Sequence, residues 1–255
     1  MVDSTPAHPF GIDFGGSGIK GAQVDLTTGT FATERTRIET PAGGRPDDVA
    51  TVVQRLVAEG AADDAAVGVT VPAVVSHGVV RSAANIDRNW IGTDAVGLLS
   101  ERVGRHVVVV NDADAAGLAE VRYGAAKDRR GLVVVTTLGT GIGTALVYDG
   151  ALVPNSELGH LEVDGRDAET VAANSIREKE GLGWAEWAER LTRYYRSLER
   201  LLSPDLFVVG GGVSKHADRY LPLLEIDTPI VPATLRNTAG IVGAAALAAE
   251  AYAAA

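Results

Sequence analysis

The sequence contains no cysteine among its 255 residues. Disulfide bonds, thiolate metal sites and a cysteine nucleophile are therefore excluded. Aromatic residues make up only 5% of the chain, and no apolar stretch reaches the roughly 18–20 residues of a membrane-spanning helix. The chain has 23 lysine and arginine residues against 33 aspartate and glutamate residues. The resulting net charge of −10 argues against nucleic acid as a partner. These absences predict a cytoplasmic protein that binds neither nucleic acid nor membrane.

The remaining composition is that of a globular protein with two lobes. Hydrophobic residues make up 46% of the chain, which is enough to build a core in each of two lobes of about 120 residues. We place the boundary between the lobes near residue 110, where the chain leaves a strand predicted at 107–110. We therefore expect an N-terminal lobe of residues 1–110 and a C-terminal lobe of residues 111–237, with an alanine-rich helix at 238–255 packing back on the first lobe.

A unit of strand, glycine-rich loop and returning strand occurs twice, at residues 10–26 and again at 132–148. Gly15 and Gly139 occupy matching places in the two copies. Such a match indicates a repeat of whole half-domains. The predicted fold class is α/β, with a mixed sheet flanked by helices in each lobe and a cleft between the lobes.

The glycine loops are candidates for phosphate binding. Residues 16–21 match G-x-G-x-x-G, but a strand follows where a dinucleotide-binding fold needs a helix, so we reject that interpretation. Glycine lets backbone N–H groups approach phosphate oxygens closely, whereas two ordinary hairpin turns are the alternative. The predicted phosphate-binding residues are Gly15, Gly16, Ser17, Gly18 and Lys20 in the first copy and Gly139, Thr140, Gly141 and Gly143 in the second.

Two charged residues of the first copy each allow two interpretations. Asp13 either hydrogen-bonds its own turn or holds the water shell of Mg²⁺ without binding the metal directly. Lys20 either contacts a phosphate or is solvated at the surface.

A polar cluster, Asn111-Asp112-Ala113-Asp114, opens a predicted helix at 112–123. One of these side chains can cap the helix, but three exceed what capping needs. Ligands of open α/β sheets lie beyond the carboxyl ends of strands, where this cluster is placed. We therefore predict that Asp112 is a general base, which takes a proton from a hydroxyl that attacks a phosphoryl group.

Glu157 and His160 follow the second copy of the repeat. Without cysteine, a structural zinc site is disfavoured. A carboxylate accepts hydrogen bonds and an imidazole donates or accepts them, so the pair suits vicinal hydroxyls; a solvated surface loop is the alternative. Helices are predicted next at 167–180 and 183–202.

Taken together, these motifs resemble those of the repressor, open reading frame and sugar kinase (ROK) family, in the actin-like, ribonuclease H-like ATPase superfamily. The motifs are D-F-G-G-S-G-I-K-G at 13–21, N-D-A at 111–113, L-G-T-G-I-G at 138–143, E-L-G-H at 157–160 and G-G-G-V-S at 210–214. Family members usually carry a cysteine-rich zinc loop after the Gly-His pair. Its absence here makes the chain similar to the actinobacterial polyphosphate glucokinases of the family.

The resemblance implies a role for each matching position. Asp112 would act on the 6-hydroxyl of glucose, with Mg²⁺ as cofactor and polyphosphate or ATP as phosphoryl donor. The other sugar-binding residues would be Asn85, Asn111, Glu157, His160 and Glu169, and the nucleotide or polyphosphate region would comprise Gly210, Gly211, Gly212 and Lys215. A homodimer is also implied, and the aromatic stripe of helix 184–198 would suit either a dimer interface or the core.

Three functional hypotheses remain open: a polyphosphate-dependent glucokinase that also uses ATP, an ATP-dependent hexokinase for another sugar such as mannose, and a non-catalytic sugar-responsive regulator. The last is expected to need an N-terminal helix-turn-helix domain, for which the residues before the first strand leave no room. Polyphosphate would need a row of basic residues leading from the cleft, unless these are only solvated surface charges. The candidates are Lys127, Arg129, Arg130, Arg177, Lys179 and Lys215.

Overall fold

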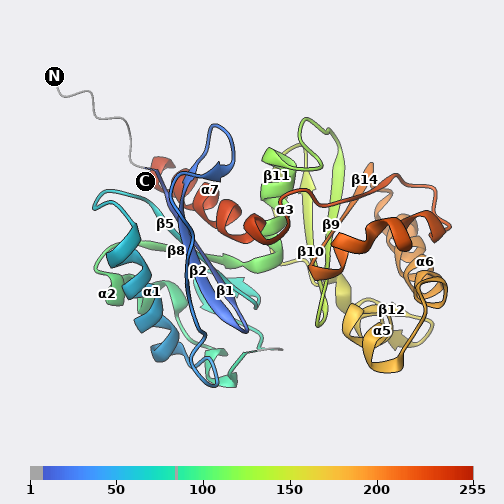
Figure 1. Ribbon diagram of the computed structural model, residues 1–255, viewed down its shortest axis with the longest axis horizontal. Coiled ribbons are helices and arrows are strands. Elements are labelled where there is room, and N and C mark those ends of the chain that lie inside the picture. Colours follow the sequence, from blue (N-terminus) through green and yellow to red (C-terminus); the bar gives the residue numbers. More distant parts are fainter. Residues whose placement is uncertain (1–7, 84–85, 255) are drawn as a thin grey trace. The chain divides into compact units, whose positions relative to one another are not determined.

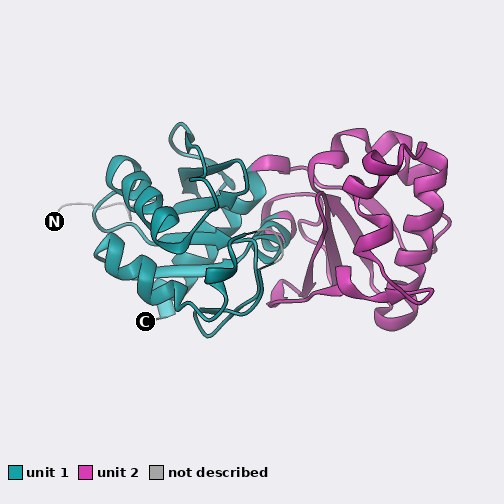
Figure 2. Cartoon of the chain, turned by 90° about the horizontal axis from the view of Figure 1, so that it is seen from below, with its two compact units in different colours: residues 1–119, 238–255 teal, residues 120–237 magenta. Residues whose placement is uncertain are grey.

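The computed structural model describes residues 8–83 and 86–254. Contacts divide the chain into two compact units (Figure 2). Unit 1 comprises Met1–Ala119 together with Thr238–Ala255, and unit 2 comprises Glu120–Asn237. The division falls within helix α3 (Asp112–Tyr123), and the lobe boundary near residue 110 remains a prediction. Unit 2 is thus one continuous segment, whereas unit 1 is assembled from two.

Unit 1 contains a mixed sheet in the order β3-β2-β1-β5-β8, with β4 pairing with β2 as well. Figure 1 labels four of these strands, β1, β2, β5 and β8. β1 runs antiparallel to β2 and parallel to β5, and β5 runs parallel to β8. The central position of β5 matches its sequence, because all five of its residues are buried. The strands are β1 (Phe10–Gly15), β2 (Gly18–Asp25), β3 (Thr30–Phe31), β4 (Thr36–Ile38), β5 (Val67–Val71) and β8 (Val107–Asn111), and a separate hairpin pairs β6 (Val75–Ser76) with β7 (Val79–Val80).

Helices α1 (Pro46–Gly60) and α2 (Ala95–Val103) contact each other and share the core of unit 1. α1 begins with proline, whose fixed φ suits the first helical position. α2 is capped by Asp94, which accepts a hydrogen bond from Gly97 N at 2.9 Å, and it ends at Gly104 in the left-handed conformation. Local sequence signals therefore set where these helices begin and end.

Helix α7 (Ala239–Ala254) lies against β1 and β5 (Figure 1). The contact is between backbones: a Cβ at Gly11 would collide with the carbonyl oxygen of Ile241, and a Cβ at Gly68 with that of Ala244. On α7 itself, a Cβ at Gly243 would collide with the carbonyl oxygen of Ala115 in α3. Small residues on both surfaces are what permits this close approach.

Unit 2 contains a second mixed sheet in the order β11-β10-β9-β14-β15. β9 runs antiparallel to β10 and parallel to β14, so the order and the strand directions match those of unit 1. The predicted α/β fold with a half-domain repeat is confirmed. The strands are β9 (Leu132–Leu138), β10 (Ile142–Tyr148), β11 (Ala151–Val153), β14 (Leu206–Gly210) and β15 (Ile230–Pro232).

The segment after β11 differs from the single helix predicted at 167–180. Its first residues form a short hairpin of β12 (Glu162–Val163) and β13 (Arg166–Asp167). Two short helices follow, α4 (Glu169–Ala172) and α5 (Asn174–Glu180). They are separated at Ala173, where φ −59° and ψ 151° are extended rather than helical.

The aromatic stripe of α6 (Trp184–Leu202) is part of the core of unit 2. Its buried members are Trp187, Leu191, Tyr194, Tyr195 and Leu198. Because these side chains are already covered, the stripe does not support a dimer interface, and the predicted homodimer rests on the resemblance alone. Among the described residues, no helix combines the length and the apolarity that crossing a membrane requires.

The contact of α7 predicts a large stability effect at Gly68. Replacing Gly68 with Ala places a methyl group against the Ala244 carbonyl, so we expect the free energy of unfolding to fall by about 2–3 kcal/mol in chemical denaturation. Gly212→Ala is the matched control, since no heavy atom lies within 4 Å of the added Cβ. Equal stability of the two variants would contradict the backbone contact.

Candidate functional site

The first glycine segment forms a tight turn between two paired strands. β1 and β2 pair as far as Gly15 and Gly18, so that only Gly16 and Ser17 lie outside the strands. The Gly15 carbonyl accepts from Thr40 Oγ1 at 2.6 Å. A Cβ at Gly16 would have no heavy atom within 4 Å, so the backbone at the tip of the turn is open to a ligand.

Arg37 also holds this turn. Its Nη2 donates to the Ser17 carbonyl at 2.6 Å, and its guanidinium lies against Gly18. Lys20, predicted to bind phosphate, lies within β2 directly opposite Arg37 of β4. Two basic side chains therefore lie close to the predicted phosphate turn.

Asp13 has partners on both neighbouring strands. Lys20 Nζ donates to Asp13 Oδ2 at 3.2 Å, and Thr70 Oγ1 donates to Asp13 Oδ1 at 3.3 Å. The N-terminal turn of α7 lies next to this carboxylate, since a Cβ at Gly240 would be 3.0 Å from Asp13 Oδ1. Asp13 thus bonds across the sheet rather than to its own turn, and Lys20 is ion-paired rather than simply solvated.

The described residues contain no cluster of three or more histidine or acidic side chains that could hold a metal. One carboxylate beside a phosphate-binding turn fits Mg²⁺, which keeps several waters and is held chiefly by the phosphates of a substrate. Among the described residues of unit 1, Asp13 is a carboxylate beside the predicted phosphate turn.

Asn111 and Asp112 stand at the junction of β8 and α3. Asn111 Oδ1 accepts from the backbone N–H of Ala113 at 2.8 Å and of Asp114 at 3.0 Å, and its Nδ2 donates to the Ala73 carbonyl at 3.0 Å. Asn111 therefore caps α3 and is buried. Asp112 is only half-buried and accepts from Ala113 N through Oδ1 at 2.8 Å, so its carboxylate is oriented and accessible. Asn85, also predicted to bind sugar, lies outside the described residues.

In unit 2, the second glycine segment is a turn at residues 139–141. Gly139 N donates to the Gly141 carbonyl at 2.9 Å, and Gly143 lies within β10 opposite Thr137. Ser175 of α5 donates from its N–H to the Gly139 carbonyl at 3.0 Å and from Oγ to the Thr140 carbonyl at 2.6 Å. The turn is thus held by a segment more than thirty residues further along the chain.

The three residues predicted to bind sugar from unit 2 lie together. Glu169 Oε2 accepts from Ile142 N at 2.8 Å and lies against Gly141. Glu157 precedes the 3-10 helix η2 (Leu158–His160), and its Oε2 is 3.9 Å from His160 Nε2. The structure therefore groups Glu157, His160 and Glu169 beside the second glycine turn.

Contacts with β10 hold η2 in place. The carbonyl oxygen of Ile142 would collide with a Cβ at Gly159, and Thr144 Oγ1 accepts from Leu158 N at 3.1 Å. The glycine of the E-L-G-H motif is thus needed for close packing, which fixes the backbone between Glu157 and His160.

Sequence reasoning missed Asp167. Its Oδ2 lies 2.9 Å from His160 Nδ1, and its Oδ1 accepts from Glu169 N at 3.0 Å. A signal was present, because Asp164-Gly165 has the composition of a two-residue hairpin turn. Both residues adopt the left-handed conformation, and the turn brings Asp167 back toward His160.

The electrostatics of this group raise two pKa values. Burial raises the pKa of the Glu157 carboxyl, nearby His160 opposes the rise, and Glu169 adds to it. The hydrogen bond with Asp167 is the main cause that raises the pKa of His160, against the effect of burial. Protons are therefore held more tightly here than on the same groups in water.

The third glycine segment follows β14. Gly211 has φ 82° and lies so close to Leu138 that a Cβ would collide with its backbone, whereas a Cβ at Gly212 would meet open space. Gly210 ends β14, and Lys215 is exposed on the 3-10 helix η3 (Gly212–Arg219). Gly211 thus has a packing role, and Gly212 is open to a ligand.

The predicted basic residues divide into two groups. Arg177 of α5 stacks on Trp184 at 4.3 Å from the ring centre, and α5 also holds the second glycine turn. Lys127, Arg129 and Arg130 instead precede β9, and a seven-residue strand places them about 20 Å from that turn. Arg177 and Lys179 share α5, which contacts the turn at the carboxyl end of β9, where the donor is expected. Lys215 follows the neighbouring strand β14.

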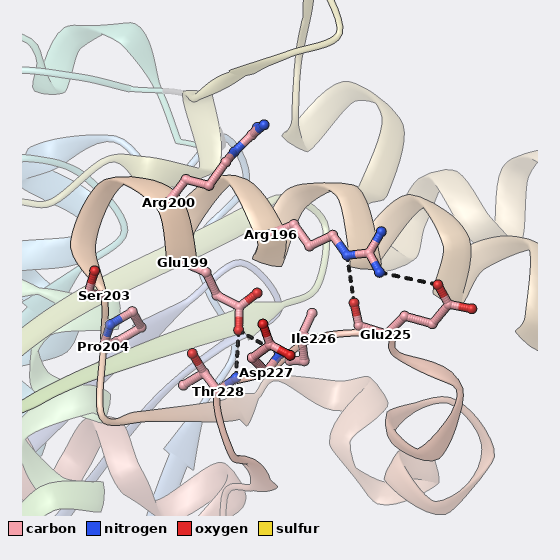
Figure 3. Close-up of a pocket in the computed structure, with 9 residues that line it drawn as sticks. All are labelled: Arg196, Glu199, Arg200, Ser203, Pro204, Glu225, Ile226, Asp227 and Thr228. Atoms are coloured by element: carbon pink, nitrogen blue, oxygen red, sulfur yellow. Dashed lines mark hydrogen bonds and ion pairs between the residues drawn. The ribbon is translucent and has the colours of Figure 1, made fainter.

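A groove of about 740 Å³ lies elsewhere on unit 2, between α6 and residues 225–228 (Figure 3). Three of its charged side chains have partners: Arg196 bonds with Glu225, and Glu199 Oε1 accepts from the N–H groups of Asp227 and Thr228. None of the predicted site residues lines it. We do not assign it to the candidate site.

Comparisons with known proteins identify relatives along nearly the whole chain. A model of the ROK family matches residues 9–175. Polyphosphate glucokinase of Mycobacterium tuberculosis (strain CDC 1551 / Oshkosh) is 52% identical over 243 residues, covering 95% of this chain and 91% of that protein.

Solved structures are also similar along nearly the whole chain. The inorganic polyphosphate/ATP-glucomannokinase of Arthrobacter sp. strain KM is 55% identical, with a TM-score of 0.91, and 96% of this chain and 99% of that chain are covered. A ROK family glucokinase from Streptomyces griseus, solved in complex with glucose and AMPPNP, has a TM-score of 0.80 at 24% identity, covering 95% and 99% of the two chains. The latter likeness concerns the fold alone.

The junction of β8 and α3 predicts different effects for its two polar residues. Asn111→Ala removes the cap and the bond to Ala73, so we expect the free energy of unfolding to fall by about 2 kcal/mol. Asp112→Asn keeps an oxygen at the same place and should cost less than about 1 kcal/mol. Urea titration of both variants measures this, and an equal loss would contradict the division between a capping and an accessible residue.

The His160–Asp167 pair predicts a pH dependence of stability. The pKa of His160 in the folded chain is raised above its ordinary value of 6.5, so the pair stabilises fully below that pH and its contribution is lost as the pH rises through the raised pKa. The stability difference between the wild type and His160→Gln should therefore shrink from about pH 6 to about pH 9, by less than about 1 kcal/mol because the pair is partly exposed. A difference that stays constant in denaturation at both pH values would contradict the raised pKa.

Proposed function

The chain belongs to the ROK family, and from this premise we propose that it transfers a phosphoryl group from inorganic polyphosphate to the 6-hydroxyl of glucose. The observation that carries the proposal is the 52% identity with a polyphosphate glucokinase across nearly the whole of both chains. A non-catalytic regulator is not proposed, because relatives above 50% identity bear the names of enzymes.

Asp112 acts as the general base. Its half-buried carboxylate is oriented by the N–H of Ala113 and stands at the carboxyl end of β8. The carboxylate takes the proton from the sugar hydroxyl as the hydroxyl oxygen forms its bond to phosphorus and the bond to the rest of the donor breaks. The capping bonds of Asn111 fix the backbone before this residue, so the base is held in place before the substrate binds.

Glu157, His160 and Glu169 bind the other sugar hydroxyls, together with Asn85 and Asn111. Their grouping beside the second glycine turn supports this assignment. Glu157 and Glu169 accept hydrogen bonds from hydroxyls, and His160 presents its Nε2 edge. Asn111 Nδ2 donates one hydrogen to the Ala73 carbonyl, which leaves its second amide hydrogen for the sugar.

The donor phosphates bind at the glycine segments, where the backbone at Gly16, Gly139 and Gly212 is open to a ligand. In unit 1 the residues of these segments are Gly15, Gly16, Ser17 and Gly18, with Lys20; in unit 2 they are Gly139, Thr140, Gly141 and Gly143, with Gly210, Gly211, Gly212 and Lys215 further along the donor. We propose Mg²⁺ as the cofactor, and Asp13 would hold its water shell. The bound ion would supply neutralisation of the charge on the transferred phosphoryl group.

ATP as a second donor and mannose as a second acceptor are favoured by one relative. The Arthrobacter protein at 55% identity is named an inorganic polyphosphate/ATP-glucomannokinase. We therefore propose both as additional substrates. The homodimer and the cytoplasmic location remain predictions.

The test is a comparison of substrates followed by one substitution. Formation of glucose 6-phosphate is measured with polyphosphate or ATP, with and without Mg²⁺, and with mannose in place of glucose. Asp112→Asn should lower kcat by about 10³-fold, because the proton acceptor is lost, while calorimetry should still detect glucose binding.

Asp64→Asn, at an exposed aspartate of the same unit, is the matched control and should turn over normally. Near-normal activity of Asp112→Asn would rule out its role as general base. Absence of sugar phosphorylation with either donor in the wild type would refute the proposed function as a whole.

A further inference from the structure

We infer that Asp167 is a positioning residue, which holds the imidazole of His160 so that its Nε2 edge faces a sugar hydroxyl. The inference rests on the proposed function, in which His160 binds the sugar. It adds a residue that no sequence motif indicated.

The first support is the way in which the chain brings Asp167 to His160. The turn at Asp164 and Gly165 reverses the chain, and β13 pairs with β12 so that Asp167 stands opposite Glu162. Ala168 N then donates to the Leu161 carbonyl at 3.0 Å, which continues the ladder by one bond. The hairpin thus places Asp167 beside the end of η2.

The second support is that both carboxylate oxygens of Asp167 are engaged. Oδ2 is 2.9 Å from His160 Nδ1, and Oδ1 accepts from Glu169 N at 3.0 Å. A carboxylate fixed at one oxygen by a backbone N–H cannot follow a rotating ring, so its other oxygen selects one ring orientation. The same side chain therefore links two of the proposed sugar-binding residues.

The third support is the chemistry that this contact leaves at the other edge of the ring. Because the carboxylate accepts a hydrogen bond from Nδ1–H, the neutral ring carries its hydrogen on Nδ1 and offers Nε2 as an acceptor. When the ring is charged, Nε2 donates instead. His160 remains 48% exposed, and Glu157 Oε2 lies 3.9 Å from Nε2, so a hydroxyl can reach both groups at once.

The charged groups that face His160 come from three elements: Glu157 before η2, Asp167 of β13 and Glu169 of α4. All three are acidic and favour the charged imidazole. Asp167 makes the direct hydrogen bond, so removing its charge should have the largest effect on the proton affinity of the ring.

A purely structural role for Asp167 is the competing explanation, since its Oδ1 also holds the N-terminus of α4. Asp167→Asn separates the two roles, because the amide oxygen can still accept from Glu169 N while the negative charge at Nδ1 is lost. Asp167→Glu keeps the charge. Asp164→Asn is the matched control: it makes the same change in the same hairpin, at a carboxylate that lies 3.7 Å from Arg193.

The experiment combines NMR with kinetics. Long-range ¹H–¹⁵N spectra of the uniformly labelled full-length chain report the tautomer and the pKa of His160, whose signals are assigned by their loss in His160→Gln. Spectra are recorded with and without glucose. KM for glucose and kcat are measured for each variant with the donor that supports turnover in the wild type.

We expect the Nδ1–H tautomer in the wild type and in Asp164→Asn. Asp167→Asn should lower the measured pKa of His160 by about one pH unit. It should also raise KM for glucose about tenfold while kcat changes less than about threefold, since one oriented hydrogen bond to the sugar is lost. Asp167→Glu should restore both quantities to within about threefold of the wild type.

Two failures can be told apart. If glucose leaves the His160 signals of the wild type unchanged, the sugar-binding role of His160 is wrong, and the inference fails with it. If glucose does shift those signals but Asp167→Asn retains the wild-type tautomer and KM, the proposed function stands and the positioning role of Asp167 is refuted.

Discussion

Glycine at positions 11 and 68 lets helix α7 lie against β1 and β5 with its backbone in direct contact. The arrangement around Asp13 in unit 1 depends on this contact. It brings the N-terminal turn of α7, with Gly240, next to the carboxylate of Asp13, where the positive end of the helix dipole favours negative charge. The bonds of Asp13 to Thr70 and Lys20 then fix that carboxylate beside the predicted phosphate turn.

The residues assigned to chemistry also maintain the local structure. Asn111 caps α3 and binds the Ala73 carbonyl. Glu169 holds the second glycine turn, and Asp167 holds both Glu169 and His160. Each polar side chain is thereby oriented before any substrate arrives, which reduces the ordering that binding must impose. The same bonds mean that a substitution in the site changes local stability as well as binding.

Much of the fold was predictable because its signals are local or repeated. The two strand–glycine–strand copies and the polar cluster after β8 follow from patterns within short stretches. The extent of the glycine turns was not predictable, because Gly18 and Gly143 look like loop residues until the partner strands are known. The ion pair of Lys20 likewise depends on strand register.

The segment after Gly159 was predicted least well. Residues 167–180 were predicted as one helix, and the turn signal of Asp164-Gly165 was not used. The hairpin that brings Asp167 to His160 was therefore missed. Asp167 could not be assigned from spacing alone, since its contact depends on a turn of two left-handed residues. Contacts of this kind require register and turn geometry together.

Unit 1 is built from both ends of the chain, and this affects the order of events at the ribosome. The strands of its sheet emerge first, but the face at Gly11 and Gly68 stays uncovered until α7 has been made. By then every residue of unit 2 has already been synthesised. Unit 2 can therefore complete its core before unit 1 does. The nascent sheet of unit 1 keeps an open face during most of translation.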